Sequence, residues 1–152
     1  MMLQPTHLGR DDEVRVYARD TLVVVVPNSD TGFEETRAFV EDRSAQLGAR
    51  IGVVVLVRPG IQGDAMRLRE STRAFLTEGA DALACMAYAI DGRGFFASRF
   101  LSVASGIFLH VRDATIPMKA CVSAAEACDW VAAHLGEAPW VRPFVDGVRE
   151  QL

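Results

Sequence analysis

The chain has 152 residues, and half of them are hydrophobic, which is enough for one domain that buries roughly 70% of the surface of its unfolded chain. Its 20 carboxylates outnumber 16 basic side chains. The basic residues are scattered rather than clustered, so we expect no nucleic-acid partner. The apolar runs are far shorter than the ~20 residues of a membrane-spanning helix, and we expect no membrane span and a cytoplasmic location.

The three cysteines support that location. Cys85, Cys121 and Cys128 are an odd number, they lie in apolar surroundings, and none belongs to a Cys-x-x-Cys pair. Such residues are typical of small core side chains in a reducing compartment.

Residues 1–13 are predicted to form a polar N-terminal leader that precedes the folded domain. Alternating side chains from Val14 to Ala18 then predict a half-buried strand. A turn at Asp20 and Thr21 separates this strand from the apolar run Leu22 to Val26, and a connection this short predicts a β-hairpin.

The first helix is predicted to begin at a capping box. In Thr31-Gly-Phe-Glu34 the Thr31 hydroxyl would accept from a helical amide while Glu34 reaches back. The helix would bury a stripe that contains Phe33, Phe39, Val40 and Leu47, and Gly48 would end it.

A second strand-and-helix unit follows. The run Ile51 to Val57 has no polar alternation, which is typical of a strand covered on both faces. A helix is predicted after Asp64, its N-cap, with Thr72 and Phe75 on its buried face. Residues 82–90 predict another covered strand.

The last part of the domain repeats this order. Residues 95–109 have helical spacing, and residues 118–122 predict a final strand. A second capping box, from Ser123 to Glu126, opens a helix in which we expect Trp130 to be largely buried.

These elements predict an α/β domain over residues 14–136, with a single mixed sheet of about five strands, about four helices and the order ββαβαβαβα. This order resembles the STAS superfamily, and especially its branch of uncharacterised bacterial proteins similar to sporulation anti-sigma-factor antagonists. The segment that carries the resemblance at the level of individual residues is Met118-Lys-Ala-Cys-Val-Ser-Ala-Ala-Glu126-Ala-Cys-Asp-Trp130-Val.

The resemblance implies a non-enzymatic regulatory or protein-interaction module. Antagonists of this type are switched by phosphorylation of a Ser or Thr at the start of the helix after the third strand. Here Asp64 stands at that corner, and no hydroxyl is present from Val57 to Met66. We therefore expect no kinase switch, and Ser71 and Thr72, further along, do not restore the pattern.

Two glycine-rich corners are the candidate ligand sites, because ligands of open α/β sheets collect at the carboxyl ends of the strands. Exposed backbone amides and nearby arginines would hold a small anion or a lipid head group. The candidate residues are Arg58, Gly60, Gly63 and Asp64 at the first corner, and Asp91, Gly92, Arg93, Gly94 and Arg99 at the second. The alternative is that both corners are plain turns.

Other groups carry weaker signals. His7, His110 and His134 fall in three elements without ligand spacing, so we expect no metal site and no cofactor. The acidic pairs at residues 11–13 and 34–35 are interpreted as solubilising groups.

The C-terminal tail, residues 137–152, places Trp140, Phe144 and Val148 at fourfold spacing. We expect a short helix packed on the domain; the alternative is that Trp140 and Phe144 contact a partner protein or a second copy.

Three functional hypotheses follow. We favour a protein-interaction module that recognises another protein or itself. The alternatives are an anion-binding or lipid-binding module that uses the glycine corners, and an enzyme whose site only the fold assembles. No recognisable nucleophile-and-base pair supports the enzyme.

Overall fold

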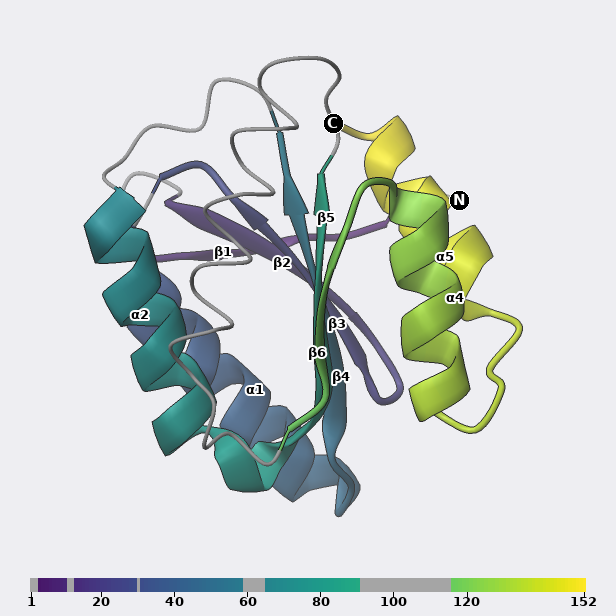
Figure 1. The fold of residues 1–152 in the computed structure, drawn as a ribbon, viewed down its shortest axis with the longest axis horizontal. Helices are drawn as coiled ribbons and strands as arrows, with labels where there is room; N and C mark the ends of the chain where they lie inside the picture. Colours follow the sequence, from purple (N-terminus) through teal and green to yellow (C-terminus); the bar gives the residue numbers. More distant parts are fainter. Residues whose placement is uncertain (1–2, 11–12, 30, 59–64, 91–115) are drawn as a thin grey trace.

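The fold is known from a computed structural model, which describes residues 3–10, 13–29, 31–58, 65–90 and 116–152. Among these residues a single six-stranded sheet carries helices on both faces (Figure 1). The strands are β1 (Thr6–Leu8), β2 (Val14–Arg19), β3 (Leu22–Pro27), β4 (Ile51–Val57), β5 (Leu83–Ile90) and β6 (Met118–Cys121). The helices are α1 (Phe33–Leu47), α2 (Ala65–Glu78), α4 (Ala124–His134) and α5 (Val141–Glu150), with a 3-10 turn η2 (Ala80–Ala82).

The strands lie in the sheet in the order in which they occur in the chain. The first three form an antiparallel meander, and β3 through β6 run parallel. The predicted α/β class, the mixed sheet and the 20–21 hairpin turn are confirmed, although the sheet has six strands rather than five. The extra strand, β1, lies at one edge within the segment expected to be a polar leader.

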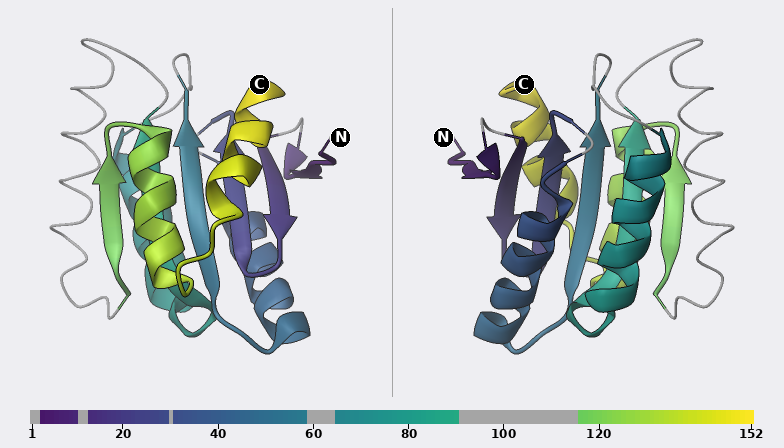
Figure 2. Two further views of the ribbon diagram at one scale, coloured as in Figure 1. Left: turned by 90° about the vertical axis from the view of Figure 1, so that its right-hand side faces the viewer. Right: turned by 90° about the vertical axis from the view of Figure 1, so that its left-hand side faces the viewer.

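Alternation along the central strands explains the two-sided core. Val23 and Val25 of β3 face one cluster of buried side chains, whereas Leu22, Val24 and Val26 face the other. Every residue of β4 is buried, as expected for a strand covered on both faces. Helices α1 and α2 cover the first cluster, and α4 and α5 cover the second (Figure 2).

Helix α1 begins differently from the prediction. Its N-cap is Gly32, in a left-handed conformation with φ 87°, and no side chain caps it. The Thr31 hydroxyl instead lies 2.7 Å from the Ser29 hydroxyl. The capping box expected at Thr31 is therefore wrong, because the chain turns through the glycine. At the other end, Gly48 ends the helix as predicted, with φ 62°, but Leu47 is 45% exposed and does not join the buried stripe.

Helix α4 begins as the sequence predicts. The Glu126 amide donates to the Ser123 hydroxyl at 3.1 Å, and the Glu126 carboxylate accepts from the Val122 amide at 3.3 Å. Trp130, however, is only half-buried, because Ala127, Cys128 and Val131 form the inner face of the helix. Its ring instead stacks on His134, 4.2 Å away. Trp130 therefore packs against the core, as predicted, but at the side of α4 and with part of its ring exposed.

Candidate functional site

A groove with a volume of about 520 Å³ lies between α1 and α2. Such a volume is within the range of ligand-binding clefts. We call it the acidic groove, because its charged lining consists of five glutamates and one arginine: Glu13, Glu34, Glu35, Glu70, Glu78 and Arg37. Thr31, Gly32, Phe33, Ser71, Ala74 and Phe75 complete the lining.

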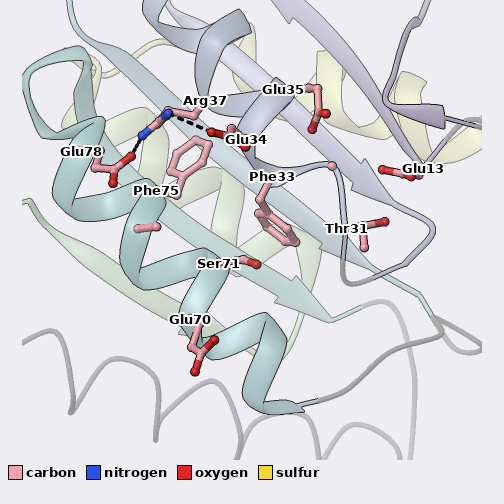
Figure 3. A pocket seen from close by; sticks show the side chains of 12 residues that line it. Glu13, Thr31, Phe33, Glu34, Glu35, Arg37, Glu70, Ser71, Phe75 and Glu78 are labelled. Carbon is pink, nitrogen blue, oxygen red and sulfur yellow. Dashed lines mark ion pairs between the residues drawn. The ribbon is translucent and has the colours of Figure 1, made fainter.

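Arg37 compensates some of the carboxylates of the acidic groove (Figure 3). It forms an ion pair with Glu78 of α2 and lies 3.7 Å from Glu34 and 3.8 Å from Glu41. Arg37 thereby joins α1 to α2 and compensates the carboxylates around it.

Three other glutamates of the lining have no such partner. Among the described residues, no basic side chain forms an ion pair with Glu13, Glu35 or Glu70. The three come from the β1–β2 connection, the first turn of α1 and α2, respectively. Carboxylates that line a cleft raise the local concentration of cations, so the acidic groove is suited to a positively charged group.

Glu13 is the most firmly placed of these carboxylates. Its carbonyl accepts from the Asn28 amide at 2.8 Å, which fixes its backbone beside the carboxyl end of β3. The Glu13 side chain lies against two glycines with left-handed backbones, Gly9 and Gly32. A Cβ added to Gly9 would lie 2.6 Å from Glu13 Oε2, and one added to Gly32 would lie 3.4 Å from the same oxygen. Side chains at these two positions would displace the Glu13 carboxylate.

The floor of the acidic groove is apolar. Phe33 and Phe75 lie between α1 and α2 (Figure 3), and they are 6% and 2% exposed. Because these rings are already buried, the groove offers a partner mainly carboxylates and hydroxyls. Recognition there would depend on charge more than on apolar contact.

The candidate site expected at the first glycine corner is only partly described. Arg58 follows β4 at its carboxyl end, and its Nη2 donates to Asn28 Oδ1 at 3.2 Å. Its buried Nε has no hydrogen-bond partner among the residues that the structure describes. Gly60, Gly63 and Asp64 lie outside the described residues, as do Asp91, Gly92, Arg93, Gly94 and Arg99 of the second corner and the helix expected at 95–109.

The C-terminal tail forms a short helix packed on the domain, α5, as predicted. Phe144 is 7% exposed and packs in the core, which contradicts for this residue the alternative of a contact with a partner. Trp140 is half-buried at the start of α5, where the Arg19 guanidinium lies 5.1 Å from its ring centre. The tail folds back over the domain as an amphipathic helix, and its apolar face is already covered.

The buried titratable groups do not line the acidic groove. Burial raises the pKa of Cys85 to about 12 and the pKa values of Cys121 and Cys128 to about 11. A thiol that stays protonated is a poor nucleophile. Among the described residues no three His, Cys, Asp or Glu side chains are placed to hold a metal ion, and no helix there has the length and apolarity to cross a membrane.

Comparison with protein-family models, with curated proteins and with solved structures finds no match for this chain. The sequence predicts Glu13, Glu34 and Glu35 to be solubilising groups, and it does not single out Glu70. The positions of two of these glutamates in the chain indicate that they lie close together. Glu13 comes just before β2, and Glu34 comes after β3, the antiparallel neighbour of β2. In an antiparallel pair the start of one strand lies beside the end of the other.

Proposed function

We propose that this protein is a non-enzymatic interaction module that binds a partner protein through arginine or lysine side chains placed in the acidic groove. The observation that carries the proposal is that Glu13, Glu35 and Glu70 line the groove without an ion-pair partner in the described part of the chain, whereas Arg37 compensates Glu34 and Glu78. A basic side chain of a partner would supply the counter-charge of these three glutamates.

Binding rather than catalysis is favoured by the chemistry of the groove lining. The groove lining contains the hydroxyls of Thr31 and Ser71, but no histidine is among the described residues that line it. Activation of a hydroxyl nucleophile requires an adjacent base that is oriented by a third group. The raised pKa values belong to Tyr88 and to the three cysteines, which lie elsewhere.

The regulatory part of the proposal rests on the resemblance to the STAS superfamily. The hairpin followed by alternating helices and parallel strands supports that resemblance. Thr72 is fully buried, which supports a module that works without a phosphorylated hydroxyl at this position. The three cysteines, all free, support a bacterial cytoplasm as its location.

Isothermal titration with a short arginine-rich peptide tests the proposal. The variant Glu35→Gln/Glu70→Gln removes two charges from the groove, and Asp129→Asn/Glu150→Gln removes two exposed charges elsewhere. We expect about tenfold weaker binding for the groove variant, since each rim charge contributes up to about 1 kcal/mol, and less than a twofold change for the control. An equal loss in both variants would show that the peptide responds to net charge alone.

A second candidate function, the binding of a small anion or lipid head group, is favoured by one observation. In the described ranges of the chain, the buried Nε of Arg58 has no hydrogen-bond acceptor at the carboxyl end of β4. A phosphate oxygen would satisfy it, because guanidinium groups bind phosphate through parallel N–H donors. Titration with inorganic phosphate, with Arg58→Gln as the comparison, separates this function from recognition of a basic partner.

A further inference from the structure

Helix α5 covers one part of the sheet as a separate layer. Its buried side chains, Val141, Phe144, Val145 and Val148, pack in the cluster that contains Leu22, Val24 and Val26 of β3. It also packs on α4, where Cys128 belongs to the same cluster. No strand of the sheet pairs with α5 or follows it in the chain. Its removal would therefore leave every strand ladder intact.

The connection between α4 and α5 turns sharply through two left-handed residues. Two consecutive residues, Gly136 and Glu137, have left-handed conformations, with φ 79° and 61°. This conformation is unfavourable for a residue with a Cβ. The Glu137 and Ala138 amides both donate to the Ala132 carbonyl, at 2.9 Å and 3.3 Å, so the strained Glu137 is held by the end of α4.

The far end of α5 is fastened to the N-terminal segment of the chain. The Leu3 amide donates to Gln151 Oε1 at 2.6 Å, and Gln151 Nε2 donates back to the Leu3 carbonyl at 3.0 Å. The Leu3 side chain lies over Gly147, where an added Cβ would be 3.3 Å from Leu3 Cδ1. We call these contacts between Leu3, Gln151 and Gly147 the latch.

We propose that α5 is a hinged cover, that it opens as a unit about Gly136 and Glu137, and that the latch to the N-terminal segment controls this opening. A contact that withdraws Leu3 would release the far end of α5 and uncover the apolar face of β3. The proposal is independent of the acidic groove, which lies on the opposite face of the sheet. An outer helix that no strand depends on opens at lower free energy than the central strands.

Cys128 is a built-in reporter of this opening. It is 1% exposed, and Asp146, Arg142 and Arg149 of α5 all contribute to its electrostatic environment, so α5 lies close to it. Cys85 lies in β5, where α4 packs, and is fully buried. Opening of α5 exposes Cys128, whereas exposure of Cys85 requires the sheet to unfold.

The test is thiol labelling with N-ethylmaleimide under native conditions, with each cysteine followed by peptide mass spectrometry. We expect Cys128 to react at least tenfold faster than Cys85. Gln151→Ala, which removes both latch hydrogen bonds, should speed the labelling of Cys128 by about tenfold, and Glu150→Ala, an exposed neighbour, by less than twofold. Equal rates at Cys128 and Cys85 would overturn the proposal, and so would a Gln151→Ala variant that labels at the wild-type rate.

Discussion

The hydroxyl oxygens of Thr72 and Tyr88 lie 2.8 Å apart inside the protein, where neither residue is more than 1% exposed. Thr72 is on α2 and Tyr88 on β5, so this hydrogen bond fixes the helix that forms one wall of the acidic groove onto the sheet. A buried hydroxyl that loses its partner keeps its desolvation penalty. The pair therefore sets the position of α2 as well as contributing to stability.

We predict that Thr72→Val and Tyr88→Phe each lower the free energy of unfolding by about 1–3 kcal/mol. The double variant should lose less stability than the sum of the two single losses, with a coupling energy of about 1 kcal/mol. The reason is that each single variant leaves one hydroxyl without this hydrogen bond, whereas the double variant contains neither hydroxyl. Urea denaturation of the four proteins measures the cycle. Strict additivity would mean that the hydrogen bond does not contribute to stability.

The two glycines that flank α1 form a matched pair. Both have left-handed backbones, but a Cβ on Gly32 would lie 2.5 Å from Val14 Cγ2, whereas one on Gly48 would meet nothing within 4 Å. Gly48→Ala should cost about 1 kcal/mol from backbone strain alone. Gly32→Ala should cost at least about 1 kcal/mol more, because overpacking adds to the strain. Equal midpoints in urea would contradict the packing of Gly32 on β2.

Some local features are predictable from the sequence and others are not. The Ser123 box and the Gly48 stop depend on neighbouring residues, and both are present. The box expected at Thr31 fails because a nearby hydroxyl, that of Ser29, engages Thr31 and Gly32 takes the N-cap position. Local patterns do not specify such competition between partners.

The acidic groove was not predictable in the same way. Glu13, Glu35 and Glu70 are separated by 22 and 35 residues in the chain, and their convergence depends on the order of strands in the sheet. Periodicity predicts which face of a helix or strand is buried, but it does not predict the order of the strands in the sheet. The burial of Phe144 likewise depends on where α5 lies.

Trp130 should contribute less to stability than a fully buried tryptophan. It is half-buried at the side of α4 and stacks on His134. We predict that Trp130→Ala lowers the free energy of unfolding by about 1–2 kcal/mol, below the roughly 3–5 kcal/mol of buried aromatic truncations. Phe75→Ala, at a site 2% exposed, is the comparison and should fall in the higher range. A larger loss for Trp130→Ala than for Phe75→Ala would contradict this placement.

The stability of the protein should fall at high pH. Burial raises the pKa of Cys85 from 9.0 to about 12 and that of Tyr88 from 10.0 to about 12. The folded state therefore binds more protons than the unfolded state above pH 9, and stability that is complete below that pH is lost as pH rises toward 12. Each group contributes a slope of up to about 1.4 kcal/mol per pH unit.

Urea denaturation between pH 7 and pH 11 measures this dependence. Near pH 7–8 the thiols and Tyr88 are protonated in both states, so we expect them to cause no change in the free energy of unfolding there. Above pH 9 the free energy of unfolding should decrease. Tyr88→Phe should make the decline above pH 10 shallower, since the phenol no longer contributes. A stability that rises between pH 9 and pH 11 would show that these groups are not buried in the protonated form.

The central claim, that the acidic groove recognises a basic partner, is tested most directly by backbone amide shifts in two parallel NMR titrations of the native protein. One uses an arginine-rich peptide and the other inorganic phosphate, both at physiological ionic strength. We predict that the peptide shifts the amides of Thr31 to Glu35 and of Glu70 to Phe75, and that these shifts disappear in Glu35→Gln/Glu70→Gln. Phosphate-induced shifts at Asn28 and Arg58, with no response of the groove amides to the peptide, would contradict the claim and favour anion binding.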